Sequence, residues 1–199
     1  MKKYLLVLAM VFALAGNVLA DPIIWIGSTR YDVGELSGPN GTDYWTMNGP
    51  ANPSAQDISN LVNGGGALFE VYKQNVGDIG DTGMYASSYE TTFSPPTDPD
   101  GAVITWIGPS YIEVDGVPAY LVVKDGNQNP SVYIFNLREL GWDGMETISL
   151  CNFWPDEGAI SHVTIYDPPT AVPEPATMFL LGSGLIGLAG YGRKKFSKK

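Results

Sequence analysis

The sequence predicts an all-β fold, an antiparallel β-sandwich or jelly-roll-like body of the lectin type, with one short helix and an apolar segment at each end. Short runs of β-branched and aromatic residues alternate with clusters of glycine, proline, asparagine and aspartate. Asp115-Gly116 and Asp125-Gly126 are typical of hairpin turns, and no repeat of 20–50 residues is present. The expected strands are Ile23–Ile26, Ala67–Lys73, Tyr85–Phe93, Ala102–Ile107, Tyr111–Val114, Ala119–Val123, Ser131–Leu137, Thr147–Phe153 and Ile160–Tyr166.

One helix is expected between the first two of these strands. Asn52 can cap its N-terminus, and Gly64 can end it. Ile58, Leu61 and Val62 have helical spacing and would form one apolar face. The body is therefore expected to be β-rich with a single short amphipathic helix.

The charge of the chain is divided unevenly along its length. All 21 acidic residues lie between Asp21 and Glu174, together with only four of the 11 basic residues, so this part has a formal charge of −17. Such a body repels phosphate, which argues against a nucleic-acid-binding protein. A single cysteine and a single histidine exclude a disulfide framework and a histidine-rich metal site. Cys151 is expected to be a small buried side chain, with an intermolecular disulfide as the alternative.

The first twenty residues have the features of a secretory signal peptide. Lys2 and Lys3 give the positive start, and Leu5–Ala15 give an apolar stretch of the usual length. Cleavage is expected between Ala20 and Asp21, because small residues precede that bond. We therefore expect export through the Sec machinery and processing by signal peptidase.

The C-terminal end has three parts in a fixed order. An extended proline-containing peptide comes first, an uncharged apolar stretch follows, and a basic tail ends the chain. As a helix, the apolar stretch would span about 24 Å, and snorkelling lysines can make up the difference to a hydrocarbon core of roughly 30 Å. The parts are Val172, Pro173, Glu174 and Pro175, then residues 176–191, then the tail 192–199 with Arg193, Lys194 and Lys195.

This arrangement resembles the PEP-CTERM sorting signal of Gram-negative bacteria that make extracellular polysaccharide. The resemblance implies an exosortase, a membrane-embedded cysteine transpeptidase, as the partner that processes the chain near Pro-Glu-Pro. It also implies anchoring in the inner membrane before processing, and a place at the cell surface or in the extracellular matrix afterwards. The expected domains are the signal peptide (1–20), the ectodomain (21–168) and the sorting signal (169–199), in which 169–175 is the linker with the motif.

A second, weaker resemblance covers about a third of the body. Residues Ala119–Tyr166, with Gly141-Trp142-Asp143-Gly144 among them, are similar to the end of many PEP-CTERM ectodomains. This resemblance supports a β-sandwich and implies no biochemical activity.

The sequence shows no set of residues that predicts catalysis. His162, the single histidine, follows Ser161 directly, so in a strand the two side chains would point to opposite faces. Glu113 and Asp115 could share one face of a strand, as the carboxylate pair of a glycoside hydrolase does. With 21 acidic residues such a pair is expected by chance, so the body is expected not to be an enzyme.

Calcium is the one metal for which the sequence offers ligands. Loops with Asp98, Asp100, Asp125 and Asn127 could supply the carboxylate and carbonyl oxygens that Ca²⁺ prefers. The same residues are common in ordinary hairpin turns, and the last loop lacks the glycine and the glutamate of an EF-hand. No other cofactor is expected.

Two tryptophans are candidates for stacking on sugar rings. Trp142 and Trp154 stand beside glycine, aspartate, asparagine or proline, which favours loops, although core packing is the more common role of tryptophan. Three hypotheses therefore remain open. The first is a non-enzymatic surface protein associated with exopolysaccharide in a biofilm, the second a carbohydrate-binding module of the lectin type, and the third a secreted glycoside hydrolase.

Overall fold

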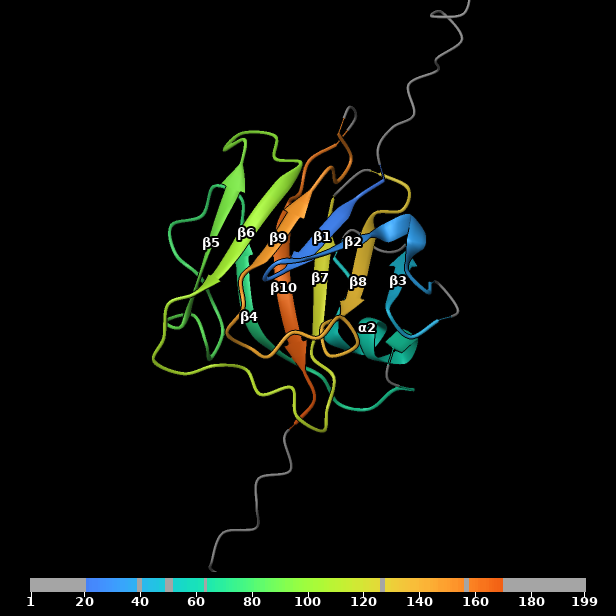
Figure 1. The fold of residues 1–199 in the computed structure, drawn as a ribbon, viewed down its shortest axis with the longest axis vertical. Coiled ribbons are helices and arrows are strands. Elements are labelled where there is room, and N and C mark those ends of the chain that lie inside the picture. Colours follow the sequence, from blue (N-terminus) through green and yellow to red (C-terminus); the bar gives the residue numbers. More distant parts are fainter. Residues whose placement is uncertain are drawn as a thin grey trace, which may run out of the picture. The chain divides into compact units, whose positions relative to one another are not determined.

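The protein folds as two antiparallel sheets packed face to face (Figure 1). The computed structural model describes residues 21–38, 41–48, 52–62, 64–125, 128–155 and 158–169. This part of the chain contains ten strands, divided equally between the two sheets. The expected all-β sandwich is thus confirmed, whereas the signal peptide and the apolar C-terminal segment lie outside the described residues.

Each sheet joins strands that are far apart in the sequence. Sheet A has the order β2-β1-β9-β6-β5, and sheet B has the order β3-β8-β7-β10-β4. The strands of sheet A are β2 (Thr29–Asp32), β1 (Ile23–Ile26), β9 (Ile148–Cys151), β6 (Gly101–Trp106) and β5 (Tyr89–Ser94). Those of sheet B are β3 (Tyr44–Met47), β8 (Val132–Asn136), β7 (Tyr120–Lys124), β10 (His162–Asp167) and β4 (Phe69–Asn75). A short 3₁₀ helix, η1 (Val33–Glu35), follows β2.

The main core lies between the two sheets. Sheet A contributes Ile24 and Ile104 to it, and sheet B contributes Leu121 and Ile165, all at most 1% exposed. Every second residue of these strands faces inward, as the pleat of a strand requires. Burial of this apolar surface stabilises the fold.

A second, smaller cluster lies on the outer face of sheet B, where the helix α2 (Ala55–Val62) packs. Ile58 is fully buried there against Val122 and Ile134. Leu61, which was expected to share this face, is 41% exposed.

Ser54, rather than the expected Asn52, caps this helix. Asp57 N donates to Ser54 Oγ at 3.2 Å, and Ser54 N donates to Asp57 Oδ2 at 2.8 Å. The two residues therefore satisfy each other's free backbone groups at the helix start. These bonds hold the pKa of Asp57 below its usual value, the side-chain bond from Ser54 being the main cause.

Three segments differ from the expected strands. Residues Thr29–Asp32 and Tyr44–Met47 form edge strands that the sequence did not predict. Residues Tyr111–Val114 were expected to form a strand and do not, which corrects that prediction. Ile112 and Val114 are buried, but Ile112 N donates to the hydroxyl of Tyr89 at 2.8 Å, so a side chain replaces a neighbouring strand.

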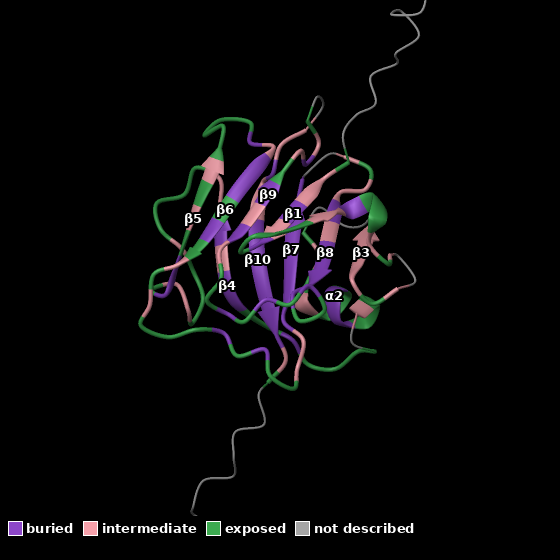
Figure 2. Cartoon of the chain, viewed as in Figure 1, coloured by how far each residue is buried: buried purple, intermediate pink, exposed green. Residues whose placement is uncertain are grey.

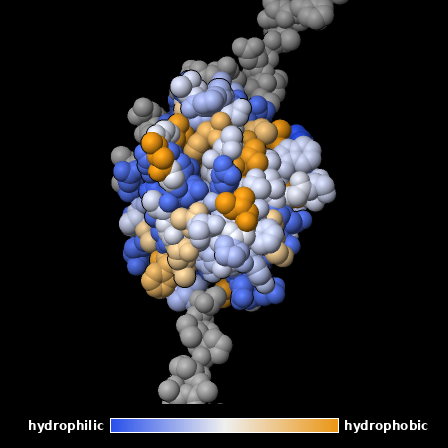
Figure 3. All heavy atoms as spheres, turned by 90° about the vertical axis from the view of Figure 1, so that its left-hand side faces the viewer, coloured by the Kyte–Doolittle hydropathy of each residue, from blue (hydrophilic) through white to orange (hydrophobic). Residues whose placement is uncertain are grey.

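The described surface is mostly polar with scattered apolar side chains. On the face shown in Figure 3, hydrophobic groups stand apart from one another among hydrophilic ones. Ile79 and Met84 are the most exposed large hydrophobic residues. Cys151, which was expected to be buried, is exposed at the end of β9. It lies on the outer face of sheet A, where its register partner Ile23 is also only half-buried.

Candidate functional site

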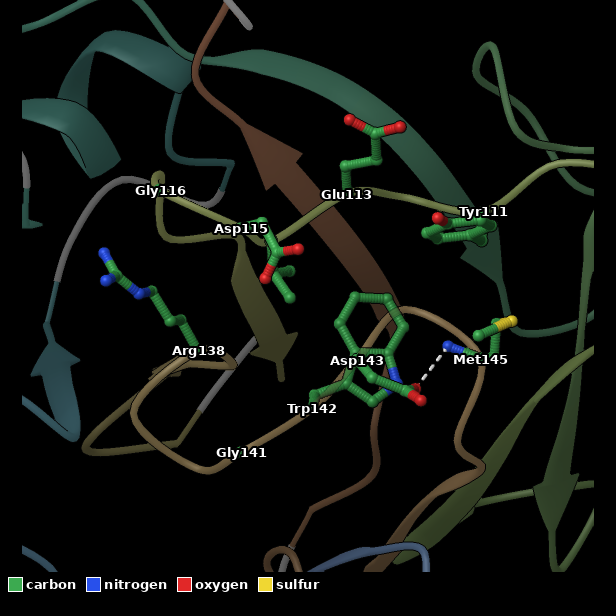
Figure 4. Close-up of a pocket in the computed structure, with 10 residues that line it drawn as sticks. Tyr111, Glu113, Asp115, Gly116, Arg138, Gly141, Trp142, Asp143 and Met145 are labelled. Carbon is green, nitrogen blue, oxygen red and sulfur yellow. Dashed lines mark hydrogen bonds between the residues drawn. The ribbon is translucent and has the colours of Figure 1, made fainter.

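A pocket of about 590 Å³ lies between two loop segments, residues 111–116 and 138–145 (Figure 4). The first segment leads into β7, and the second connects β8 to β9. The lining residues are Tyr111, Glu113, Val114, Asp115, Gly116, Arg138, Gly141, Trp142, Asp143 and Met145. The pocket therefore combines carboxylates, one guanidinium group and aromatic rings.

Tyr89 of β5 holds the two walls of the pocket together. Its hydroxyl donates to Gly144 O at 2.6 Å and accepts from Ile112 N at 2.8 Å. Burial raises the pKa of Tyr89, so the hydroxyl keeps its proton and remains a donor. A side chain at Gly144 would bring its Cβ to 2.2 Å from Ile112 O, so the close approach of the two walls requires glycine there.

The floor of the pocket is Trp142, only 2% exposed. Its indole Nε1 donates to Glu146 O at 2.7 Å, and its ring packs near Tyr89 with centroids 6.1 Å apart. The expectation that Trp142 offers an exposed ring for stacking is therefore wrong. Trp142 packs in the core because burial of its indole removes a large apolar area from water while the single donor, Nε1, stays hydrogen-bonded.

The rim of the pocket carries side chains that reach solvent. Tyr111 is 40% exposed and Arg138 is exposed, and they lie on opposite sides of Trp142 in Figure 4. The Arg138 side chain makes no hydrogen bond or ion pair with any residue that the structure describes. An unpaired guanidinium beside carboxylates can bind hydroxyl groups or a carboxylate of a ligand.

The predicted pair Glu113 and Asp115 does reach one site, since both residues line this pocket and both are exposed. Asp143 lines it too, but its Oδ1 accepts from Met145 N at 2.8 Å and from Glu146 N at 2.9 Å, so it also holds its own loop. These carboxylates provide acceptors for the hydroxyl groups of a polar ligand.

A buried carboxyl lies close to Glu113 but not in the pocket. Asp167, the last residue of β10, is 6% exposed, and its Oδ1 has no hydrogen-bond partner among the described residues. Burial, and then the charge of Glu113, raises the pKa of Asp167 to about 6. A carboxyl next to another carboxylate in an apolar setting holds its proton more tightly.

Trp154 lies elsewhere and is half-buried. Its Nε1 donates to Pro130 O at 2.9 Å, and its ring packs against Tyr133 and Phe153, with centroid distances of 5.4 Å and 5.8 Å. The two predicted stacking residues therefore do not form one site. Because Trp154 is only half-buried, stacking there stays a prediction.

Two of the predicted calcium ligands, Asp100 and Asp125, accept hydrogen bonds from the backbone between β9 and β10. Asp100 O accepts from Phe153 N at 2.8 Å, and Asp125 Oδ2 accepts from Ala159 N at 2.8 Å. Asp98 is exposed, whereas Asp125 is 4% exposed. No group of three or more acidic, histidine or cysteine residues in the described ranges could hold a metal ion. Asn127 lies outside those ranges, and calcium binding stays a prediction.

His162 is the first residue of β10, as its predicted strand implied. Ser161 precedes the strand, and its Oγ lies 3.4 Å from His162 Nδ1, so the two side chains are neighbours and do not point to opposite faces. The Ser161 hydroxyl donates to Lys124 O at 3.0 Å. Burial is the main cause that lowers the pKa of His162 to about 4. This histidine is therefore a poor general base near neutral pH.

Residues 171–194 match the PEP-CTERM protein-sorting motif. The chain carries a PEP-CTERM sorting signal. Such a signal implies export, anchoring in a membrane, processing by an exosortase and sorting to the surface, as in Gram-negative bacteria. No curated protein and no solved structure matches the chain.

The PEP-CTERM match covers most of the predicted sorting residues. Val172, Pro173, Glu174, Pro175, Arg193 and Lys194 lie within it, and Lys195 follows it directly. These residues and Ala20 lie outside the described part of the structure, and Asp21 is its first residue. Among the described residues no helix has the length and apolar character to cross a membrane, and residues 176–191 were not among them.

Proposed function

We propose that this PEP-CTERM protein is a non-enzymatic component of the cell surface or extracellular matrix, associated with exopolysaccharide in a biofilm. The sorting signal at residues 171–194 carries the proposal, because it delivers the body to the place where such polysaccharide lies. The acidic composition of the body is compatible with this location, because a high net charge opposes aggregation of a protein outside the cell.

The first experiment measures the intact mass of the protein recovered from the envelope and culture fluid of its own cells. A species that begins at Asp21 and ends near Pro175 would support both processing steps. A Pro173→Ala, Glu174→Ala double variant should remain full-length at its C-terminus. Wild-type protein that ends at Lys199 in the inner membrane would show that the tail acts only as an anchor.

Association with polysaccharide needs its own measurement. Processed protein should remain with purified exopolysaccharide from its own cells in sedimentation or gel-retardation assays. Absence of retention would contradict the matrix role and leave the sorting step untouched.

The pocket favours carbohydrate binding as a second candidate function. Its exposed tyrosine, unpaired guanidinium and carboxylates suit a polyhydroxylated ligand, which needs many acceptors and donors around a ring-sized cavity. Tyr111→Ala and Arg138→Gln should each weaken glycan binding about tenfold or more. Arg30→Gln is the matched control, because it removes the same charge on β2, away from the pocket-lining residues.

The same preparations test the hydrolase alternative. Release of new reducing ends from a polysaccharide, lost in Asp115→Asn, would indicate a glycoside hydrolase and contradict the non-enzymatic role. Binding without turnover would support the hypothesis that the pocket binds carbohydrate as a lectin does.

A further inference from the structure

The few basic side chains of the body are gathered unevenly. Four basic residues stand against 21 acidic ones between Asp21 and Glu174. Arg30 pairs with Asp32 and Arg138 lies at the pocket, whereas Lys73 and Lys124 both lie beside His162, the only histidine. Half of the basic residues of a strongly acidic body thus flank its one imidazole, on sheet B.

The strand register places these residues on one face. Lys124 of β7 is directly opposite His162 of β10, and Lys73 of β4 is directly opposite Thr164, two residues further along β10. Opposed residues of antiparallel strands point to the same face, with Cβ atoms about 4.5–5.5 Å apart. Val122, which is also opposite Thr164, packs in the cluster under α2. The face is therefore the outer face of sheet B.

Two polar groups of this face are buried with unused hydrogen-bonding capacity. The Thr164 side chain is 1% exposed, and its Oγ1 has no partner among the described residues. Lys124 is 3% exposed, and its Nζ donates one bond, to Asp125 O at 3.2 Å. Buried polar groups are normally paired, so the unpaired hydroxyl of Thr164 calls for an explanation. An anion bound over this face would supply an acceptor for it and a further acceptor for Lys124 Nζ.

The two lysines act electrostatically on His162 despite the acidity of the body. Burial and then the charges of Lys73 and Lys124 lower the pKa of His162 to about 4. Burial is likewise the main cause that lowers the pKa of Lys124, with Lys73 adding to it and Asp125 opposing it.

Acidic neighbours are also present on the adjoining elements. Glu70 Oε2 lies 3.8 Å from Lys73 Nζ on β4, and Asp78 accepts a hydrogen bond from Asn75, the β4 residue opposite His162. Asp125 follows β7. Burial and the charges of Lys73 and Lys124 are nevertheless the causes that lower the pKa of His162.

We propose that Lys73, Lys124, His162 and Thr164 form a binding site for an anionic group, a carboxylate or sulfate carried by an acidic glycan, on the outer face of sheet B. Lys73 and His162 are partly exposed and would meet the ligand first, whereas Lys124 and Thr164 are buried beside them on the same face. The choice of a glycan as carrier rests on the proposed function, whereas the anion site itself does not.

The hydrogen bonds at His162 give this site a pH dependence. Because the Ser161 hydroxyl donates to Lys124 O, its oxygen is available as an acceptor 3.4 Å from His162 Nδ1, and this arrangement favours the tautomer with its proton on Nδ1. Nε2 is then unprotonated in the free protein near neutral pH. A bound anion favours the protonated imidazole, so at pH values between the free and the bound midpoints binding takes up a proton from solvent onto Nε2. The affinity should therefore rise as the pH falls.

Proton NMR of the full chain in detergent tests the site, because the one histidine gives one unambiguous imidazole Cε1–H signal. The titration midpoint of His162 should rise from about 4 to above about 5 when galacturonate oligosaccharides are added; a rise of one pH unit corresponds to about tenfold tighter binding to the protonated form. A neutral oligosaccharide should leave the midpoint unchanged. An unchanged midpoint with the acidic oligosaccharide and with inorganic sulfate would overturn the site.

Matched variants separate a local site from net charge. Lys73→Gln should weaken binding about tenfold, and Arg30→Gln, with the same change of charge on the opposite sheet, less than twofold. Thr164→Val should weaken binding without lowering the melting temperature. Loss of a hydroxyl with a merely structural role would instead lower the melting temperature and leave binding unchanged. Equal losses in Lys73→Gln and Arg30→Gln would overturn the proposal, because net charge alone would then explain them.

Inorganic sulfate distinguishes the source of the anion. Binding of the oligosaccharide and not of sulfate supports a glycan ligand. Binding of sulfate alone, with the same dependence on Lys73, supports the anion site and contradicts a glycan as its carrier. The processing and retention experiments remain independent of either result.

Discussion

The two sheets share one core, but their outer faces differ in what covers them. In β7, all five residues are buried, because the main core packs on one side and α2 on the other. In β5 at the edge of sheet A, buried or half-buried residues alternate with exposed ones. Figure 2 shows the same contrast between the continuous buried strands of sheet B and the alternating edge of sheet A. A continuous apolar run in an antiparallel sheet thus indicates cover on both faces.

This difference also indicates how much the main core and the outer cluster each contribute to the stability of the fold. The core between the sheets joins residues from both, including several large aromatic rings. The outer cluster depends on one helix of eight residues. A helix of that length is marginal alone in water, so α2 exists through its contact with sheet B. The outer layer is therefore expected to unfold more easily than the main core.

Trp142→Ala should give the largest loss of stability and would sharpen this comparison. The change removes a fully packed indole from the main core and leaves Glu146 O without its donor. We expect a loss of about 3–5 kcal/mol, as for other large-to-small changes of buried aromatic residues. Urea denaturation followed by fluorescence measures it. Ile79→Ala, at a fully exposed side chain, is the control and should stay within about 0.5 kcal/mol.

Ile58→Ala should give a smaller loss, because α2 can move toward sheet B and fill part of the cavity. We expect about 2–3 kcal/mol, at the low end for a buried isoleucine. Hydrogen exchange should increase in α2 and on the adjacent strands β7 and β8, while β1 and β9 keep their protection. Leu61→Ala on the same helix is the control, since Leu61 is exposed. Equal exchange increases in both sheets would break the distinction between the two layers.

The sequence predicted the strands whose apolar pattern decides their structure. The runs that became β7, β8 and β10 are apolar over several residues, and hydrophobic burial alone explains them. β2 was missed because only Tyr31 of its four residues packs on the core. The two-residue turn Gly27-Ser28, with a φ of 55° at the glycine, was the available signal for this hairpin.

The pocket could be predicted only in part. Glu113 and Asp115 stood out as a carboxylate pair two residues apart, and the structure brings both to the pocket. Arg138 and Tyr111 had no such signal. The contact that joins their segments is the hydroxyl of Tyr89, which is 23 residues from Ile112 and 55 residues from Gly144. A tertiary hydrogen bond of this range leaves no local pattern.

Ser54→Ala tests the helix start directly. The hydroxyl of Ser54 accepts from Asp57 N and donates to the Asp57 carboxylate at 2.7 Å. Loss of an N-cap serine is expected to cost about 1 kcal/mol, less than either core change. Asn52→Ala is the matched control and should have no measurable effect, because Asn52 does not cap the helix. A larger loss in Asn52→Ala would restore the cap that the sequence predicted.

The smallest effect expected is the pH dependence of wild-type stability between pH 4 and 6, where two residues at opposite ends of β10 act against each other. Burial raises the pKa of Asp167 to about 6 from 3.8, so the folded state binds the extra proton and stability falls as the pH rises through this range. Burial lowers the pKa of His162 to about 4 from 6.5, so the unfolded state binds the extra proton and stability rises with pH.

Single variants should separate these two contributions. In Asp167→Asn, His162 is the one residue of the pair that still titrates, so the unfolding free energy should rise with pH from 4 to 6. In His162→Gln, Asp167 is the one residue of the pair that still titrates, so the unfolding free energy should fall over the same range. Denaturation midpoints at pH 4, 5 and 6 measure both slopes against the nearly flat wild type. Parallel curves for the two variants would contradict the opposed pKa shifts and, with them, the burial of His162 beside Lys73 and Lys124 on the outer face of sheet B.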